Sequence, residues 1–431
     1  MSHHGAHRRL SLPAQIGLAV LAGAAAGLLA RRLGAPVGDR AVAVMAFAGD
    51  LFLRALKMVV VPLLAGSIVS GVAGIGSAST LGRLLRRTFA WYVVTSLAAI
   101  LTGLVLVNVV RPGLADGVPV APRLGLTADA AALQEQLGAH GGSDLVGVVL
   151  RMIPENPVAA ATAGQMLPLI TFCILLGAAV NLLPERQHRA QVAFWESLLG
   201  AMLVITGWVI RFTPVGVFGL VGRIAAGSGG AALGPLLRYA AVVVAALAVH
   251  ALVTLPLLLR AVARVSPARH YRVLAPALLT AFSTRSSSAT LPLTMECVEH
   301  GAGVSNRVSS FVLPLGATVN MDGTALYECV AALFIAQAYG VHLALPQQAV
   351  VVVTALLASI GAAGIPSAGL VMISIILSTV GLPLEGVGLI LAVDPLLDML
   401  RTAVNVLSDS CGAVAVARHE GEHDFYPEAS P

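Results

Sequence analysis

The chain has 431 residues, of which 57% are hydrophobic and only 11% are charged. A soluble domain is usually about 45–50% apolar and about 25% charged, so this composition excludes an ordinary soluble domain and indicates an integral membrane protein. A net charge of +5 is also a feature of nucleic-acid-binding chains, but here the arginines gather where apolar runs end. We therefore expect membrane lipid as a partner and no nucleic acid.

Apolar runs of about 20 residues, the length that crosses the hydrocarbon core of a bilayer, recur along the chain. The first run lacks a small-residue cleavage site followed by a soluble body, so we interpret it as a span and not as a removable signal. With the N-terminus inside, alternate crossing places the main arginine clusters on the cytoplasmic side, and the composition favours the inner (plasma) membrane of a bacterium. The runs lie near residues 14–30, 56–72, 91–110, 167–183, 201–221, 240–259, 311–338 and 389–416.

The first half of the chain has little polar content inside its spans. In the third span, Tyr92, Thr95 and Ser96 place hydroxyl groups at i, i+3 and i+4 on one helix face. Considered alone, the Thr and Ser hydroxyls are expected to bond to local backbone carbonyls. Residues 111–144, rich in Gly, Pro, Ala and Asp, predict an extramembrane loop. The four cysteines stand singly, which favours packed thiols over disulfides or a metal site.

The second half contains apolar arms that are too short to span. The arm at residues 273–282 has only about ten residues, half the length of a crossing helix. Hydroxyl groups and Arg285 follow at residues 283–288, before a second apolar arm at 289–293. This pattern predicts a re-entrant hairpin with its tip inside the membrane, where irregular backbone is tolerated only against protein or a cavity. The alternative is a serine-rich loop outside the membrane.

The sequence NMDGT at residues 320–324 interrupts the next apolar run. Successive residues of a helix point about 100° apart, so this contiguous set cannot form one polar face. It predicts a helix that unwinds here, aided by Gly323, and releases carbonyl groups that can coordinate a cation. Oxygen ligands without His or Cys suit an alkali or alkaline-earth ion.

The hairpin pattern recurs later in the chain. Two apolar arms, 347–360 and 370–382, flank the flexible sequence GAAGIPSAG at residues 361–369. Each hairpin precedes a long apolar helix with a polar interruption. The order predicts an inverted structural repeat, the arrangement that places transporter sites near the membrane midplane.

The last long helix carries a charged face over residues 394–409. One charge at the centre of a span costs roughly 2.5–3.5 kcal/mol on insertion scales, and such groups persist when they pair, bind ions or face a cavity. We therefore predict a solute and ion site here. The chain has no Walker motif, no Rossmann glycine fingerprint and no convincing nucleophile–base pair, so we expect an ion gradient as the energy source, no enzyme activity and no organic cofactor. The stripe consists of Asp394, Asp398, Arg401, Thr402, Asn405 and Asp409, at i, i+4, i+7, i+8, i+11 and i+15.

These patterns predict an all-α membrane protein with about eight transmembrane helices and two re-entrant helical hairpins. The expected segments are a cytoplasmic N-terminal tail at 1–13, spans 1–3 at 14–110, an extracellular loop at 111–144, spans 4–6 at 145–265, hairpin 1 at 266–303, span 7 at 304–342, hairpin 2 at 343–382, span 8 at 383–418 and a cytoplasmic C-terminal tail at 419–431.

Four segments of the second half closely resemble motifs of the dicarboxylate/amino acid:cation symporter family, which includes glutamate and aspartate transporters. The resemblance extends over about residues 15–418. It implies a homotrimer whose protomers work alone, a fixed scaffold of early spans, a transport domain that crosses the membrane as an elevator, and an outer gate at the second hairpin. The motifs are TRSSSATLP (284–292), LPLGATVNMDGTALYE (313–328), SIGAAGIPSAG (359–369) and DMLRTAVNVLSDS (398–410).

The resemblance implies uptake of L-aspartate or L-glutamate together with sodium ions. In the family's arrangement, Arg401 would hold the side-chain carboxylate of the substrate, a role that suits a planar bidentate donor, and Asp398 would hold its amino group. The implied substrate-binding residues are Arg285, Ser286, Ser287, Ser288, Met321, Thr324, Ile365, Gly369, Asp398, Arg401, Thr402 and Asn405.

The same motifs imply three sets of sodium ligands. The first set is Tyr92, Thr95, Ser96, Asn320 and Asp322. The second set is Gly316, Asn320, Asn405 and Asp409. The third set, which acts mainly through backbone carbonyls, is Thr318, Met321, Ser359, Ile360 and Ala362.

Four positions discriminate within the family. Asp398 favours an amino acid over a plain C4-dicarboxylate, because a substrate without an ammonium group leaves this carboxylate unpaired. Arg401 argues against a neutral amino acid, because a buried guanidinium without an anionic partner is costly. Glu328 matches the animal members, in which this glutamate is implicated in proton movement, whereas Arg285 matches the archaeal members. Our hypothesis is that Glu328 is protonated during inward transport.

Other functions stay open from the sequence. One alternative is proton-coupled glutamate/aspartate transport. Its uptake would survive replacement of sodium by choline, whereas sodium-coupled uptake would not. A C4-dicarboxylate transporter would show competition by succinate against aspartate. An anion channel, for which broken helices and a buried arginine are also suited, would carry current without accumulating substrate. The sequence does not choose between aspartate and glutamate, which differ by one methylene.

Overall fold

The computed structural model describes residues 12–73, 79–115, 117–121, 153–163, 165–228, 233–360 and 368–426. Several predicted segments lie wholly or mostly outside the described residues. These are the N-terminal tail, most of the 111–144 loop, the tip of the second hairpin at 361–367 and the end of the C-terminal tail at 427–431.

The described residues are predominantly helical, as the composition predicts. A short antiparallel strand pair, β1 (Leu114–Ala115) with β2 (Val118–Pro119), lies in the predicted loop and was not predicted. The helices of the first half are α1 (Leu12–Leu33), α2 (Val37–Ala73), α3 (Ser79–Val110), α6 (Pro157–Thr162), α7 (Met166–Val180), α8 (Glu185–Ser228) and α9 (Leu233–Val249).

The second half begins with alternating π-helical and α-helical turns. The elements in order are the π-helical turn η2 (His250–Thr254), α10 (Leu255–Leu258), the π-helical turn η3 (Leu259–Ala263), α11 (Pro267–Thr284), α12 (Ser287–Glu296), the π-helical turn η4 (Cys297–Gly301), α13 (Asn306–Val319), α14 (Asp322–Ala338), α15 (Leu345–Ile360), α16 (Ala368–Thr379), the 3₁₀ turn η5 (Leu384–Gly386), α17 (Val387–Ile390) and α18 (Asp394–His419).

In the part of the chain that the structure describes, five helices are long and apolar enough to cross a membrane. The predicted span at 201–221 lies within the 44-residue α8, and the span at 56–72 lies within the 37-residue α2. Each helix continues through an internal proline, Pro214 in α8 and Pro62 in α2. The apolar runs did not indicate that the helices would be this long. The count of about eight spans stays a prediction. The five helices are Ala14–Leu33, Leu84–Val110, Glu185–Gly227, Gly234–Ala263 and Asn306–Ala338.

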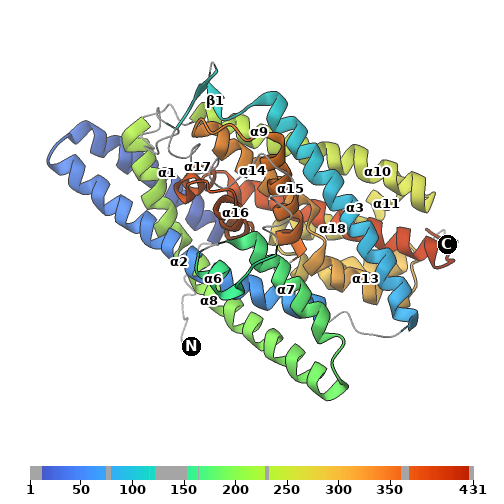
Figure 1. The fold of residues 1–431 in the computed structure, drawn as a ribbon. Coiled ribbons are helices and arrows are strands. Elements are labelled where there is room, and N and C mark those ends of the chain that lie inside the picture. The colour runs from blue at the N-terminus through green and yellow to red at the C-terminus, as the bar shows by residue number, and fades with distance from the viewer. Residues whose placement is uncertain are drawn as a thin grey trace, which may run out of the picture.

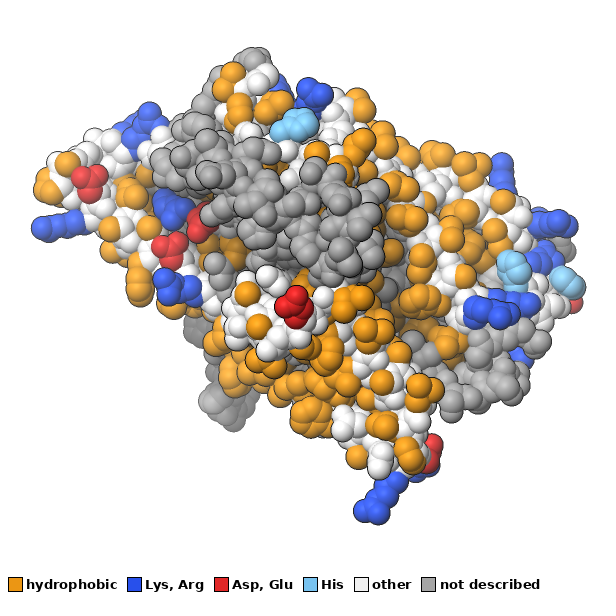
Figure 2. Space-filling view, viewed as in Figure 1, with side chains coloured by type: hydrophobic (Ala, Val, Ile, Leu, Met, Phe, Trp, Pro, Cys, Tyr) orange, Lys and Arg blue, Asp and Glu red, His pale blue; other side chains and the backbone are white. Residues whose placement is uncertain are grey.

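Hydrophobic side chains cover much of the visible surface, and Lys and Arg lie mainly toward its ends (Figure 2). Leu21 and Phe47, for example, are each 69% exposed. Soluble monomers rarely expose contiguous apolar patches larger than a few hundred Å². The surface therefore fits a membrane-embedded protein in contact with lipid.

The helices pack in two groups (Figure 1). In the first group, α1, α2 and α8 pack against one another and α7 packs against α2. In the second group, α14 is contacted by α3, α9, α15, α16 and α18. Nearly every side chain of α14 is buried, so this helix forms the centre of the second group.

The predicted interruption of the seventh span is confirmed. Helix α13 ends at Val319 and α14 begins at Asp322. Between them, Asn320 (φ −108°, ψ 85°) and Met321 (φ −114°, ψ 62°) leave the helical conformation. The break therefore frees backbone groups in the middle of the polar sequence, as the contiguous NMDGT predicted.

Helices α11 and α12 pack on each other and form the first hairpin. Its first arm starts at Pro267 rather than at residue 273, because Pro at the first helical turn is favourable and the arm is already buried at His270. The chain turns at Arg285, whose backbone is left-handed (φ 54°), and at Ser286, whose hydroxyl accepts a hydrogen bond from the Ala289 amide at 3.2 Å. The turn lies where the sequence predicted it. Its depth in a membrane stays a prediction.

Residues beyond α18 connect this helix to three others. The Glu420 carboxylate accepts hydrogen bonds from Arg87 of α3 at 2.6 Å and from Arg307 of α13 at 3.2 Å. The Tyr426 hydroxyl lies 2.9 Å from Nδ1 of His270 in α11. We name Glu420, Tyr426 and the residues between them the C-terminal clip. Part of the predicted tail is thus packed structure.

Helices α1 and α8 meet closely at Gly27. A Cβ atom added at Gly27 would lie only 2.2 Å from the backbone oxygen of Gly222 in α8. Small residues allow helices in membranes to approach at such distances. The absence of a side chain at Gly27 is therefore a packing requirement of the first helix group.

We expect Gly27→Ala to destabilise the protein by about 1–3 kcal/mol, because the new methyl group overlaps backbone that has no room to move. Thermal unfolding in detergent would measure this effect. Gly17→Ala on the same helix is the matched control, because a Cβ atom there meets nothing within 4 Å. It should leave stability equal or higher, since Ala favours helix over Gly. Equal melting temperatures for the two variants would contradict the packing argument.

Candidate functional site

The predicted stripe on α18 is confirmed as one buried face of a single helix. The helix begins at Asp394 and runs without a break to His419. All six polar side chains of the stripe are almost inaccessible to solvent. Their exposed fractions are Asp394 1%, Asp398 4%, Arg401 1%, Thr402 5%, Asn405 3% and Asp409 3%.

Arg401 is held by two carboxylates of its own helix. Its Nη1 donates to Asp394 Oδ1 at 3.0 Å, and its Nε and Nη2 donate to Asp398 Oδ1 at 3.0 and 2.8 Å. The guanidinium carbon also lies 4.1 Å from the ring centroid of Tyr327 on α14, within the range of a cation–π contact. Tyr327 donates its own hydroxyl hydrogen to Asp394 at 2.7 Å. The buried charge is therefore compensated without any ligand.

Both hairpins reach this ion pair. At the turn of the first hairpin, Arg285 Nη1 lies 3.6 Å from Asp398 Oδ2, so Asp398 stands between two guanidinium groups. In α16 of the second hairpin, a Cβ atom at Gly369 would lie 3.0 Å from Cζ of Arg401. Glycine thus lets the backbone of α16 approach the guanidinium, as the assignment of Gly369 to this site requires.

The other predicted substrate residues differ in their contacts and in their burial. Asn405 Oδ1 accepts from the amides of Gly323 at 2.8 Å and Thr324 at 3.3 Å, and its Nδ2 donates to the Thr324 hydroxyl at 3.1 Å. Asn405 therefore binds the amides of the first turn of α14, and Thr402 bonds to its own helix at the Asp398 carbonyl. Ser286, Ser287 and Met321 are buried, Ser288 is exposed, and Ile365 lies outside the described residues.

Asp322, at the start of α14, accepts hydrogen bonds at both oxygens. Ser96 and Thr95 of α3 donate to Oδ1 at 2.6 and 3.3 Å. Ser408 of α18 donates to Oδ2 at 2.6 Å, and Nε2 of His250 lies 3.1 Å from the same oxygen. Thr95 makes the expected local bond to the Tyr92 carbonyl at 3.3 Å, but both Thr95 and Ser96 also face the carboxylate of a distant helix.

Asn320 joins this group to a second carboxylate. Its Oδ1 lies 3.4 Å from the Thr95 hydroxyl, and its Nδ2 donates to Asp409 Oδ1 at 2.9 Å. Tyr92 donates to a backbone carbonyl of α13. A Cβ atom at Gly316 would lie 2.5 Å from Asp409 Oδ1 and 2.7 Å from the Tyr92 hydroxyl. The structure therefore brings the first predicted sodium set together with most of the second.

The third predicted sodium set is not assembled by side-chain contacts. Thr318 is exposed and donates to the carbonyl of Leu315, while the Ser359 hydroxyl bonds within α15. Within the described ranges, no hydrogen bond joins these two residues. The side chain of Ile360 and all of Ala362 lie outside what the structure describes, so this set stays a prediction from the family resemblance.

Glu328 lies on α14, one turn beyond Thr324, and is completely buried. Neither carboxylate oxygen has a hydrogen-bond partner among the residues that the structure describes. Burying an ionised carboxylate without partners is far more costly than burying the neutral acid. The geometry distinguishes Glu328 from Asp322, Asp394, Asp398 and Asp409, each of which accepts at least one hydrogen bond.

The buried charges fall into a balanced group and an unbalanced one. Arg285 and Arg401 face Asp394 and Asp398, so that group is electrically balanced. By contrast, no lysine or arginine in the described part of the chain forms an ion pair with Asp322 or Asp409. Carboxylates beside an unwound helix, with hydroxyl and amide oxygens nearby, are suited to bind hard cations.

Sequence reasoning missed three participants in these networks. Tyr327 and Ser408 occur on helices that were predicted, but the spacing did not show which face of α14 meets Arg401. His250 had a clearer signal. It is a lone ionisable residue in a long apolar run, which is by default a functional candidate inside a membrane.

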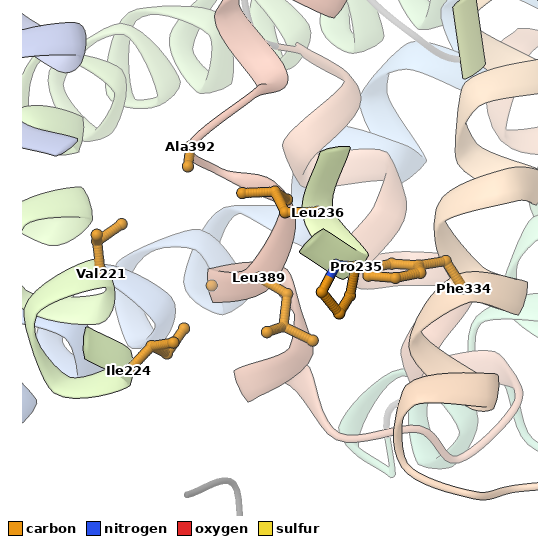
Figure 3. Close-up of a pocket in the computed structure, with 8 residues that line it drawn as sticks. Val221, Ile224, Pro235, Leu236, Phe334, Leu389 and Ala392 are labelled. Atoms are coloured by element: carbon orange, nitrogen blue, oxygen red, sulfur yellow. The ribbon is translucent and has the colours of Figure 1, made fainter. Parts of the chain in front are cut away.

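A cavity of about 60 Å³ lies apart from these polar groups (Figure 3). Its lining is apolar and is formed by residues of α8, α9, α14 and the segment around α17. None of the predicted site residues lines this cavity. The lining residues are Val221, Ile224, Pro235, Leu236, Phe334, Gly388, Leu389 and Ala392.

Comparison with known proteins agrees with the resemblance seen in the motifs. The chain is 37% identical over 383 residues to the proton/glutamate-aspartate symporter of Escherichia coli (strain K12), covering 88% of this chain and 85% of that protein. It is 38% identical over 413 residues to excitatory amino acid transporter 3 of Mus musculus, covering 86% and 79%. It is 36% identical over 440 residues to the putative sodium-dependent excitatory amino acid transporter glt-4 of Caenorhabditis elegans, covering 93% and 88%.

The sequence model of the sodium:dicarboxylate symporter family matches residues 12–419, which include every predicted site residue. Together with relatives of this identity and coverage, the match confirms the resemblance. The chain therefore belongs to the sodium:dicarboxylate symporter family.

Proposed function

We propose that the protein is a secondary active symporter that takes up L-aspartate or L-glutamate, driven by a sodium gradient. The observation that carries this proposal is the pair of carboxylates, Asp322 and Asp409, buried beside a helix break with no lysine or arginine partner among the described residues. When ionised, the two carboxylates require cations, and Asp409 lies on the same helix, α18, as Arg401, which suits an anionic substrate.

The charges around Arg401 support an amino acid with an acidic side chain. Arg401 is paired with Asp394 and Asp398 of its own helix. A substrate carboxylate that takes part of the guanidinium would leave Asp398 in need of a cation, and the substrate ammonium provides it. A plain dicarboxylate provides no such group, so its binding would separate a buried ion pair without replacing it.

The family resemblance completes the proposed arrangement. We propose a homotrimer in the inner membrane of a bacterium, with a scaffold of early helices and an elevator-like transport domain built chiefly from the second half. Substrate would contact the residues around Arg401 and both hairpins. Sodium ions would occupy the Asp322 and Asp409 groups as transported substrates, with a further site at the third predicted set.

Proton coupling is the second candidate for the energy source. Glu328 favours it, because both its oxygens are buried without partners in the described part of the chain. One relative is named a proton/glutamate-aspartate symporter, whereas another is named a putative sodium-dependent transporter. Separately imposed gradients distinguish the two candidates.

In proteoliposomes, an inward sodium gradient should drive accumulation of radiolabelled L-aspartate, because cations are needed at Asp322 and Asp409. Replacement of sodium by choline should abolish the accumulation, and excess succinate should compete only weakly. Uptake that persists in choline and follows an imposed proton gradient would contradict sodium coupling and favour the second candidate. Strong competition by succinate would contradict the assignment to amino acids.

Arg401→Ala should lower kcat/KM for aspartate uptake by about 100-fold or more. Breaking a buried ion pair on one side typically costs about 3–5 kcal/mol, and each 1.4 kcal/mol is about tenfold. Uptake measured at several aspartate concentrations tests this, with size-exclusion profiles to verify folding. Arg260→Ala is the matched control, because this arginine is exposed on η3. Equal accumulation by Arg401→Ala and the unaltered protein would exclude the proposed substrate site.

Glu328→Gln should abolish proton movement that accompanies aspartate uptake, since the amide has the shape of the carboxyl group but neither binds nor releases a proton near neutral pH. A pH-sensitive dye inside the liposomes would report the movement. Sodium-driven aspartate exchange should persist in the variant, which shows that the site remains intact. Unchanged proton movement in Glu328→Gln would refute the assignment of Glu328.

A further inference from the structure

His250 is a buried imidazole with no role in the function proposed so far. It is 0% exposed and it opens the π-helical turn η2, directly after α9. π-helical turns are rare and occur frequently at functional sites. The turn packs against α3 and α18, the two helices that provide Ser96 and Ser408 to the carboxylate of Asp322.

The tautomer of His250 follows from its neighbour. Nε2 lies 3.1 Å from Asp322 Oδ2, and an ionised carboxylate only accepts hydrogen bonds, so Nε2 carries the hydrogen. Nδ1 is buried and has no hydrogen-bond partner among the described residues. His250 therefore acts on Asp322 as a donor through Nε2.

The four donors around Asp322 are not equivalent. Ser96 and Thr95 at Oδ1 are hydroxyls, which rotate and present lone pairs when a cation arrives. At Oδ2, Ser408 is a third rotatable hydroxyl, whereas the imidazole N–H of His250 has no such freedom, because its hydrogen lies in the ring plane. Oδ2 thus has one donor of fixed direction, while Oδ1 faces only oxygen ligands that can adapt to an ion.

We propose that His250 is a positioning residue: it anchors Asp322 Oδ2 so that Oδ1 is presented to sodium together with the Thr95, Ser96 and Asn320 oxygens. This inference rests on the proposed binding of sodium at Asp322. Groups that hydrogen-bond to metal ligands from behind typically change metal affinity by about 10–100-fold when they are removed. His250 should therefore set the sodium requirement of transport without touching the amino acid.

The test compares His250→Leu, which removes the donor at similar volume, with His250→Gln, whose amide nitrogen reaches about as far as Nε2. In proteoliposomes, His250→Leu should raise the sodium concentration for half-maximal aspartate uptake by about tenfold or more. The half-saturating aspartate concentration, measured at saturating sodium, should change less than twofold. His250→Gln should restore most of the sodium affinity. Leu252→Ala on the same turn, where the side chain is 67% exposed, should behave as the unaltered protein.

A second measurement covers a variant that transports too slowly to assay. Sodium should raise the melting temperature of the unaltered protein in detergent, and His250→Leu should need a correspondingly higher sodium concentration for the same rise. Should that variant not fold, His250→Asn replaces it, because its shorter amide cannot reach Oδ2. An unchanged sodium requirement in the donor-deleting variants, or equal loss in His250→Gln and His250→Leu, would overturn the positioning role. No sodium response in the unaltered protein would overturn the proposed coupling as well, so the two failures are distinguishable.

Discussion

The organisation of the site depends on burying the guanidinium of Arg401. With 1% of its surface exposed, this group has no water to solvate it, and its charge is compensated by Asp394, Asp398 and the ring of Tyr327. Removing either carboxylate would leave an uncompensated charge, which typically costs 3–5 kcal/mol. The helices around α18 therefore have to place polar groups at fixed positions, in keeping with the approach of Arg285 to Asp398 and of Gly369 to Arg401.

A second constraint acts where α13 gives way to α14. The break exposes backbone groups that a continuous helix would satisfy, and side chains from α18 satisfy them in part. Asn405 binds the amides of the first turn of α14. Asp322, in that same first turn, is favoured there by the positive end of the helix dipole. The site thus combines α18, which carries the charged stripe, with the interrupted pair α13 and α14. The first-turn amides of α14 fix the position of Asn405 on α18, and Asn405 in turn satisfies those amides.

Much of this arrangement was predictable because helical spacing determines faces. The α18 stripe follows from the period of 3.6 residues, and the break at Asn320 follows because a contiguous polar run cannot form one face. Contacts across long sequence separations were not predictable in the same way. Nothing in the spacing pairs His250 with Asp322 or Tyr327 with Asp394, because those contacts depend on how α9, α14 and α18 rotate against one another. The exposed position of Thr318 is a similar result of tertiary packing.

The C-terminal clip has a mechanical consequence. Glu420 and Tyr426 connect the end of α18 to α3, α13 and α11, and these helices also carry the predicted ion ligands and the first hairpin. Sliding one of them past another would break several of these hydrogen bonds at once. We therefore expect any large displacement of the site to be a rigid-body movement relative to α1, α2 and α8. The distances between Arg401, Asp394 and Asp398 would then stay the same throughout the movement.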